Sequence, residues 1–254
     1  MSNPNIVAII PARYDSTRLP AKPLIDLCGK PMIQRVYEQV KQSSLIKRVI
    51  VATDHTDIAS VVSKFGEVIM TPTYLKSGSD RIAFVAKNLK DAEIIVNVQG
   101  DEPLIPPKIL DEAIQPILND DSIHVCTVVK SITSSEELFN PSVVKVILDN
   151  RNFGLYFSRS PVPYFRGATE SKEWQLNHAY YKHLGIYVFR RDFLLQFSNW
   201  RETPNEKAEQ LEQLRILENG FKIKAMITEL DSIAVDTPSD ADRVRNILEK
   251  INGS

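Results

Sequence analysis

Short apolar runs alternate with helical patterns through the first half of the chain. The runs at residues 6–10 (IVAII), 48–53 (RVIVAT) and 94–98 (IIVNV) are rich in β-branched residues and predict buried strands. The remaining predicted elements are a strand at Glu67–Met70 and helices behind Pro31, near residues 57–65 and near residues 79–89. Such alternation is typical of βαβ units, so the sequence predicts a nucleotide-binding type of α/β layer around a parallel sheet.

From about residue 123 the pattern changes to strands with fewer helices between them. Strands are predicted in HVCTVV, VVKVIL, FGLYFS and HLGIYVF, the last at residues 183–189. We therefore expect a smaller, mixed extension of the sheet in this half.

Two helix starts are marked near the end of the chain. Residues 203–206 (TPNE) supply an N-cap, a proline at the first helical position and a capping-box glutamate, which predicts one helix that Gly220 closes. Residues 237–240 (TPSD) repeat the device before an apolar helical stripe. The sequence contains no internal repeat and no flexible linker. We expect a single domain over residues 1–254, with two closely joined lobes as the alternative.

The composition argues against some classes of binding partner. The 254 residues carry a formal net charge of −1, which gives no overall attraction to nucleic acid or to an anionic membrane. The sequence shows no signal peptide and no apolar stretch long enough to span a bilayer, so we expect a cytoplasmic protein. Cys28 and Cys126 lack metal-ligand spacing and are expected to be free thiols.

Cations are concentrated in the loop behind the first strand. The segment IIPARYDSTRLPAKPL, residues 9–24, places Arg13, Arg18 and Lys22 among three prolines. Ligands of α/β sheets bind beyond the carboxyl ends of the strands, so these cations indicate a phosphate site. The segment lacks the glycine motifs of P-loops and dinucleotide folds. The alternative is a solvated surface loop without a ligand.

Two aspartates are candidate metal ligands. Asp101, in NVQGDEPLIPP at residues 97–107, follows the end of the strand at 94–98 and is expected at the same rim of the sheet as the cationic loop. A carboxylate beside a polyphosphate calls for a cation between them, and Mg²⁺ prefers such oxygen ligands. Asp101 is alternatively only part of a turn. Asp236 is alternatively an acidic residue that favours the dipole of the last helix.

A polar pair marks one late strand. Strand alternation puts His183, Gly185, Tyr187 and Phe189 on one face of KHLGIYVF, where the polar side chains can contact sugar hydroxyls. A purely structural role remains an alternative for each of the candidate sugar-binding residues His183, Glu212, Gln213 and Arg159. His183 is alternatively a hydrogen-bonded core residue, Glu212 and Gln213 are ordinary on a helix surface, and Arg159 is alternatively a surface ion-pair partner.

Taken together, these segments resemble one family across nearly the whole chain. The opening P-A-R-x-x-S-x-R-L-P-x-K-P-L, met by residues 11–24, resembles the signature of the 3-deoxy-manno-octulosonate cytidylyltransferases, also called CMP-Kdo synthetases. The resemblance continues in order through VATDH, SGSDR, VNVQGDEP, FNPSVVKVILD, YFSR, HLGIY, LEQLR and VDTP. The chain departs from the family at residues 74–76 (YLK), where many members place a histidine before the Ser-Gly pair, and at Ala21, where glycine is common.

The resemblance implies a fold and a reaction. It implies a three-layer, Rossmann-like nucleotidyltransferase sheet, mostly parallel, with residues 1–122 binding the nucleotide and residues 123–254 binding the sugar and forming a homodimer. The implied reaction transfers the cytidylyl group of CTP to the anomeric hydroxyl of 3-deoxy-manno-octulosonate (Kdo) and releases pyrophosphate. This step activates the sugar for lipopolysaccharide synthesis, with Mg²⁺ as cofactor.

The resemblance also implies a role for individual residues. The triphosphate would be held by Arg13, Ser16 and Lys22, with Ser79 and Arg81 near the nucleotide. Mg²⁺ would be bound by Asp101 and Asp236, which form the catalytic set together with Arg13 and Lys22. Kdo would be contacted by Gln99, Arg159, His183, Tyr187, Glu212 and Gln213, with Arg159 as the partner of its carboxylate.

Two other functions remain open at this stage. The first is a cytidylyltransferase for another acidic sugar, such as amino-Kdo or sialic acid. The second is a nucleotide-binding module without catalysis. The separated carboxylates and the sugar-recognition set weigh against the module, which needs neither.

Overall fold

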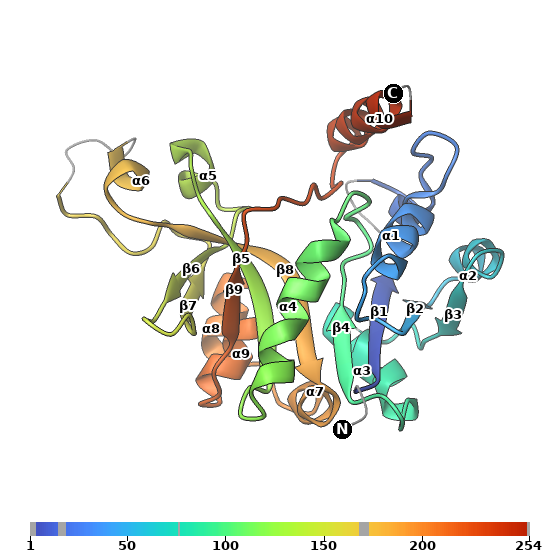
Figure 1. Ribbon diagram of the computed structural model, residues 1–254, viewed down its shortest axis with the longest axis horizontal. Coiled ribbons are helices and arrows are strands. Elements are labelled where there is room, and N and C mark those ends of the chain that lie inside the picture. The colour runs from blue at the N-terminus through green and yellow to red at the C-terminus, as the bar shows by residue number, and fades with distance from the viewer. Residues whose placement is uncertain (1–3, 15–18, 76, 168–172, 253–254) are drawn as a thin grey trace. The chain divides into compact units, whose positions relative to one another are not determined.

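A computed structural model describes residues 4–14, 19–75, 77–167 and 173–252 of the chain (Figure 1). The chain divides into two compact units. Unit 1 consists of Met1–Asp111, Phe189–Ser198 and Asp231–Ser254, and unit 2 of Glu112–Val188 and Asn199–Leu230.

Unit 1 is built on a parallel sheet with the strand order β3-β2-β1-β4. Its elements are β1 (Ile6–Ala12), η1 (Lys22–Leu24), α1 (Met32–Lys41), β2 (Arg48–Thr53), α2 (Thr56–Val62), β3 (Glu67–Met70), α3 (Gly78–Asn88), β4 (Ile94–Asn97), α7 (Arg191–Ser198) and α10 (Pro238–Asn252). The strands and helices predicted for this part of the chain are all present, within a few residues of the expected ends.

The order of the strands decides where a ligand can bind in unit 1. From β1 to β3 the chain moves outward, so right-handed crossovers place α1 and α2 on one face of the sheet. From β3 it returns to β4 on the other side of β1, which places α3 on the opposite face, where α7 packs against it. The winding reverses between β1 and β4, and in such sheets ligands bind beyond the carboxyl ends of the strands at this point.

The end of the chain belongs to unit 1, which differs from the predicted division into 1–122 and 123–254. Apolar packing explains the difference. Residues of α1 and of the turn before it share one buried cluster with the C-terminal segment: Leu27, Met32, Val235, Ala241, Val244 and Leu248. The backbone N–H of Val235 also donates to the carbonyl of Asp101 at 2.9 Å. Burial of an apolar helix face therefore returns the last helix to the first unit.

Unit 2 carries the mixed part of the fold. The strands β8, β5 and β9 are neighbours in this order, β5 and β9 are parallel, and β6 pairs antiparallel with β7 and β8. The elements of unit 2 are α4 (Pro107–Asn119, which begins in unit 1), β5 (Val125–Ser131), α5 (Ser135–Phe139), β6 (Lys145–Leu148), β7 (Gly154–Ser158), α6 (Trp174–Asn177), β8 (Tyr181–Arg190, which ends in unit 1), α8 (Pro204–Glu209), α9 (Gln213–Glu218) and β9 (Lys224–Ile227). The fold class is α/β, mostly parallel with a mixed portion, as predicted.

The prediction of one helix closed by Gly220 is wrong. The capping box at residues 203–206 is present, but α8 ends at Glu209, and the next residue, Gln210, has a left-handed backbone (φ 54°, ψ 48°). A second helix, α9, then begins and ends before Gly220, which has a φ of 81°. A left-handed residue cannot continue an α-helix, so the segment is divided into two short helices.

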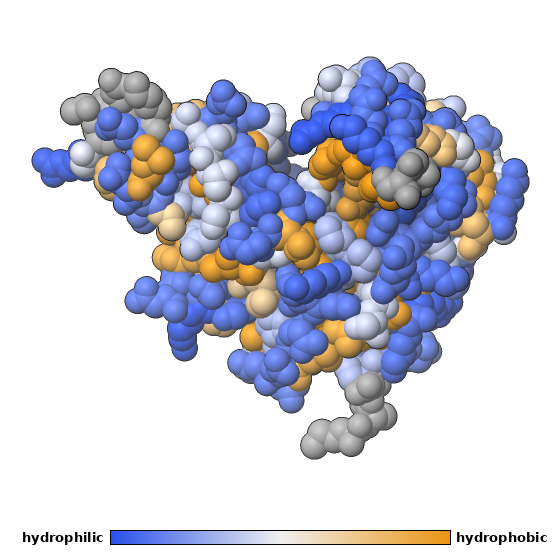
Figure 2. All heavy atoms as spheres, turned by 45° about the horizontal axis from the view of Figure 1, so that its top comes forward, coloured by the Kyte–Doolittle hydropathy of each residue, from blue (hydrophilic) through white to orange (hydrophobic). Residues whose placement is uncertain are grey.

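The surface is largely hydrophilic on the face that Figure 2 shows, with smaller hydrophobic areas between the polar residues. Among the described residues, no helix is long and apolar enough to cross a membrane. Cys28 and Cys126 are free, as predicted.

Candidate active site

A lysine lies between two aspartates at the switch point of unit 1. Lys22 is in the short η1 helix that follows the loop after β1, and Asp101 follows β4. Lys22 Nζ donates to Asp101 Oδ2 at 2.6 Å and to Asp236 Oδ1 at 2.9 Å. The structure therefore brings together three of the four residues predicted to form the catalytic set, although Asp236 is far from the other two in the sequence.

The opposite charges of Lys22 and the two aspartates stabilise one another. Burial acts to lower the pKa of Lys22, but the charges of Asp101 and Asp236 and their hydrogen bonds outweigh it and hold that pKa above its ordinary value. The alternative role of Asp236, as an acidic residue at the start of α10, is filled by another residue. Asp240 Oδ2 accepts the backbone N–H groups of Asp236 and Thr237, at 3.1 and 2.9 Å.

The two aspartates fit a divalent cation. Their side chains are 26% (Asp101) and 41% (Asp236) exposed and both reach one ammonium group, so a cation at this place would meet oxygen donors from two segments. No cluster of three or more metal-ligating side chains is found in the described part of the chain. Two protein carboxylates are nevertheless what Mg²⁺ typically takes when phosphate oxygens complete its shell.

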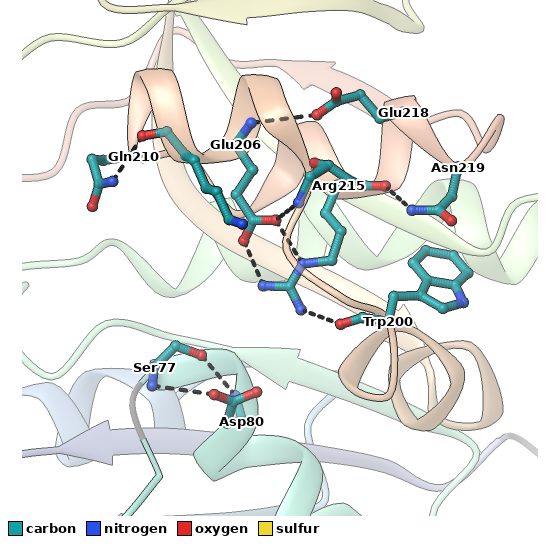
Figure 3. Close-up of polar contacts among 10 residues, drawn as sticks. Ser77, Asp80, Trp200, Glu206, Gln210, Arg215, Glu218 and Asn219 are labelled. Atoms are coloured by element: carbon teal, nitrogen blue, oxygen red, sulfur yellow. Dashed lines mark hydrogen bonds and ion pairs between the residues drawn. The ribbon is translucent and has the colours of Figure 1, made fainter.

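Arg13 contacts the segment before α3. Its Nη2 donates to the carbonyl of Leu75 at 3.2 Å, which connects the cationic loop to the stretch where the chain departs from the family pattern. Ser79 is half-buried in the first turn of α3, between Ser77 and Asp80, whose capping box Figure 3 shows. Ser16, Arg18 and Lys76 lie outside the described residues. The nucleotide-binding roles of Arg13 and Ser79 stay predictions.

Arg81 is placed in the interior. Its side chain is 0% exposed, and Nη2 forms an ion pair with Asp54 Oδ2 at 2.7 Å. The neighbouring Nη1 donates to the hydroxyl of Thr71. In this arrangement Arg81 connects the ends of β2 and β3 through Asp54 and Thr71. Its predicted place near the nucleotide stays a prediction.

Gln99 and Asp101 flank a glycine that allows a close approach. A Cβ at Gly100 would lie 2.8 Å from the backbone carbonyl of Pro11, at the end of β1. Only glycine lets the loop after β4 lie this near to β1. Gln99, which was predicted to contact the sugar, thus lies in unit 1 with Asp101, whereas the other five predicted sugar residues lie in unit 2.

His183 is a neutral hydrogen-bonding group in unit 2. Its Nε2 lies 2.8 Å from the Thr127 hydroxyl, which donates its own proton to the carbonyl of Ile186. Because that hydroxyl has one proton, His183 must be the donor through Nε2–H, and Nδ1 carries the lone pair. Burial lowers the pKa of His183 to about 4, so the ring is neutral near pH 7.

Tyr187 lies beside His183 because the strand is irregular. Four residues of regular strand span about 13 Å, but the two ring centroids are 5.1 Å apart. Gly185, between them, has a φ of 65°, which breaks the regular alternation. Burial, and then the charge of Glu212, raise the pKa of Tyr187 well above its ordinary value, so the phenol stays protonated.

Gln213 and Arg159 complete the predicted set in unit 2. Gln213 opens α9 and is 6% exposed, and its Nε2 has no hydrogen-bond partner among the described residues. Arg159 donates to the backbone carbonyls of Glu209 (2.7 Å), Pro141 (3.1 Å) and Gln210 (3.4 Å). Among the described residues its guanidinium has no ion-pair partner, and its predicted pairing with a ligand carboxylate stays a prediction.

Sequence reasoning missed several residues of these clusters. Glu102 is 7% exposed, and burial together with the charge of Asp101 raises its pKa to about 8. Thr127 orients His183, and Glu209 accepts from the Ser158 hydroxyl (2.6 Å). One signal was available for Thr127, a polar residue inside the apolar run HVCTVV.

Comparison with known proteins defines the class first. A family model described as Cytidylyltransferase matches residues 7–224. A solved structure of 4-diphosphocytidyl-2C-methyl-D-erythritol synthase from Anaerococcus prevotii is similar in fold, with a TM-score of 0.63 at 13% identity over 98% of this chain and 100% of that one.

The full-length relatives are closer. The 3-deoxy-manno-octulosonate cytidylyltransferase of Geobacter metallireducens is 51% identical over 97% of this chain and 98% of its own length. The enzyme of the same name from Chloroherpeton thalassium is 46% identical over 96% and 98%. A solved structure of CMP:2-keto-3-deoxy-manno-octonic acid synthetase complexed with CTP has a TM-score of 0.90 and 40% identity, over 97% of this chain and 99% of that one. The chain belongs to the cytidylyltransferase family and, within it, to the 3-deoxy-manno-octulosonate cytidylyltransferases.

Proposed function

We propose that this chain transfers the cytidylyl group of CTP to the anomeric hydroxyl of Kdo and releases pyrophosphate. The hydroxyl oxygen forms a bond to the α-phosphorus of CTP, the bond from that phosphorus to the bridging oxygen breaks, and the hydroxyl loses its proton. The product, CMP-Kdo, is the activated sugar for lipopolysaccharide synthesis. The observation that carries the proposal is the placement of Lys22, Asp101 and Asp236 together at the switch point, in a chain whose full-length relatives bear this name.

We assign the metal to Asp101 and Asp236. Both are acidic oxygen donors that already share one cation, Lys22 Nζ, so the donor set suits Mg²⁺. When bound, Mg²⁺ neutralises the charge of the phosphate oxygens.

The cations of unit 1 act on the phosphates. Charge grows on the α-phosphate and on the departing pyrophosphate as the bonds exchange, and Arg13 and Lys22 stabilise that growing charge. Of these two cations, Lys22 is better placed to exchange its carboxylate partners for phosphate oxygens. Its ammonium has three N–H donors and lies on a 3-10 turn at the strand end where phosphates bind.

The polar residues of unit 2 recognise the sugar. Tyr187 and Gln213 Nε2 supply hydrogen-bond donors, while Glu212 and the lone pair of His183 Nδ1 supply acceptors. A buried donor that has no protein partner is costly unless a ligand satisfies it, so Gln213 supports a sugar site here.

A sugar panel tests the proposed function. Pyrophosphate release is measured with CTP and Mg²⁺ and, in turn, Kdo, its amino analogue and sialic acid. We expect the highest kcat/KM with Kdo, because a polar set of this kind rejects a sugar that leaves one of its buried groups unpaired. Equal or better turnover of sialic acid would reassign the acceptor, and CTP binding without release from any sugar would indicate a binding module.

Variants of the two aspartates test the metal assignment. Asp101→Asn and Asp236→Asn should nearly abolish turnover, with partial recovery at high Mg²⁺ or Mn²⁺, since each change removes one anionic ligand. Asp192→Asn is the matched control, because Asp192 is in the same unit and its side chain is 92% exposed. Full activity of Asp236→Asn at low Mg²⁺ would remove Asp236 from the metal site.

We also propose a cytoplasmic homodimer. Three large side chains are exposed around the buried Trp174 in unit 2, namely Phe139 (38%), Tyr164 (75%) and Leu176 (77%). A second copy of the chain is a suitable cover for such an apolar patch. Free Cys28 and Cys126 agree with a reducing compartment. Sedimentation analysis of the wild type and of Leu176→Asp tests the dimer, which the substitution should weaken.

A further inference from the structure

A buried ion pair joins α8 to α9 in unit 2. Arg215 of α9 donates through Nε to Glu206 Oε2 at 2.8 Å and through Nη2 to Glu206 Oε1 at 2.5 Å (Figure 3). The two side chains are 8% and 7% exposed. A third guanidinium nitrogen, Nη1, donates to the backbone carbonyl of Trp200 at 3.3 Å. The guanidinium is thus held on both edges by fixed acceptors.

A second carboxylate makes the reciprocal contact. Glu218 of α9 accepts the backbone N–H groups of Asn205 and Glu206 at the start of α8, at 3.2 and 3.3 Å. Glu206 also closes the capping box of α8 by accepting the N–H of Thr203 at 3.1 Å. Each helix therefore supplies a carboxylate to the other, which fixes their relative rotation and position.

Stability alone does not account for this arrangement. Removing two charges from water costs about as much as their attraction returns, so an apolar pair of similar volume would often be as stable. What a bidentate ion pair provides is a defined geometry, because the planar guanidinium accepts a carboxylate in one orientation.

The geometry is imposed on the residues predicted to contact the sugar. Glu212 is the N-cap residue of α9 and Gln213 is its first residue, one turn or less from Arg215. The break at Gln210 frees α9 from the direction of α8, so the ion pair, and not a continuous helix, sets where Gln213 lies.

We propose that Glu206 and Arg215 are positioning residues for the acceptor-sugar site, which hold Glu212 and Gln213 in place through α9. The inference rests on the proposed function. Neither residue is expected to touch the sugar. Loss of the pair should raise the KM for Kdo and leave the KM for CTP unchanged, since the groups assigned to CTP are in unit 1.

The first experiment compares two double variants. Glu206→Gln with Arg215→Met removes both charges but keeps an acceptor for the capping box. The matched control is Glu67→Gln with Arg48→Met, which removes an equally bidentate pair (2.8 and 2.5 Å) whose side chains are 39% and 40% exposed. We expect the KM for Kdo to rise about tenfold in the first variant, a step of one decade in binding, and to stay unchanged in the control. A folded first variant with a wild-type KM for Kdo would overturn the proposal.

The second experiment remains informative if the double variant fails to fold. Arg215→Lys keeps the positive charge but loses the bidentate geometry of the guanidinium. The KM for Kdo is measured for this variant alone and in combination with Gln213→Ala. If Arg215 acts through Glu212 and Gln213, the combined variant should raise the KM for Kdo by less than the product of the two single effects, because substitutions that act through a shared group are not additive. Additive effects would overturn the proposal.

The wild type separates failure of this inference from failure of the proposed function. If it does not turn over Kdo, the proposed function has failed, and the same cycle is run with the sugar that the panel identifies. If it turns over Kdo and the effects of Arg215→Lys and Gln213→Ala add, only the positioning role has failed.

Discussion

Replacement of Lys22 by methionine should have opposite effects on metal binding and on turnover. Lys22 is the counter-ion of Asp101 and Asp236 in the structure, at 2.6 and 2.9 Å. A divalent cation that enters without nucleotide must compete with this ammonium group. With nucleotide present, the phosphates offer Lys22 another partner, so the competition ends.

The magnitude follows from the exposure of the pairs. The Lys22 side chain is 15% exposed and the carboxylates 26% and 41%, so each pair contributes no more than about 1 kcal/mol. Loss of both should release about 2 kcal/mol, or about 30-fold tighter binding of Mn²⁺ to the free protein. Turnover should fall about 100-fold, or about 3 kcal/mol, because the growing phosphate charge loses a cation.

Both effects are measurable in one set of samples. Free Mn²⁺ is titrated by electron paramagnetic resonance in the absence of CTP, and pyrophosphate release is followed with CTP, Kdo and Mg²⁺. Lys30→Met is the control, because Lys30 pairs with Glu38 on the surface of the same unit and loses the same charge. Equal Mn²⁺ affinity in wild type and Lys22→Met would refute the competition, and a change confined to the KM for CTP would limit Lys22 to ground-state binding.

Three further predictions concern stability. Gly100→Ala should destabilise the protein to urea by about 2 kcal/mol, because its Cβ would lie 2.8 Å from the Pro11 carbonyl. Between pH 6.5 and 4, His183 binds a proton in the unfolded chain but not in the folded one. Lowering the pH through this range should therefore reduce the free energy of unfolding by at most about 3 kcal/mol, and His183→Asn should lose this dependence. Burial lowers the pKa of Lys145 from 10.5 to about 8, so stability should rise between these pH values in wild type and not in Lys145→Met, as urea unfolding at each pH will show.

The elements of unit 1 could be predicted because their signals are local. Apolar runs such as residues 6–10 and 94–98 form β1 and β4, and the positions of the strands place Lys22 and Asp101 at one rim of the sheet. Asp236 was different. Spacing could not separate a metal ligand from a helix-capping residue, and only the return of the last segment to unit 1 brings it to Lys22.

The charged side chains of Arg81 and Arg159 show a second limit. From the sequence, an arginine in a motif indicates an anionic ligand. In the structure the guanidinium of Arg81 donates to Asp54 and Thr71, and Arg159 donates to three backbone carbonyls. The acceptor that an arginine contacts depends on residues that are distant in the sequence, and a short motif does not reveal them.

The break between α8 and α9 was unpredictable for the same reason. Residues 203–220 carry a helix start, a helix stop and apolar residues at helical spacing, and Gln210 is an ordinary helix former. The left-handed turn is stabilised by groups from elsewhere: Arg159 donates to the carbonyls of Glu209 and Gln210, and Arg215 reaches back to Glu206. A continuous helix would separate residues 206 and 215 by about 13 Å along its axis, so their ion pair requires the break. The left-handed turn, which the local pattern did not reveal, is therefore required for the ion pair on which the proposed positioning of Gln213 depends.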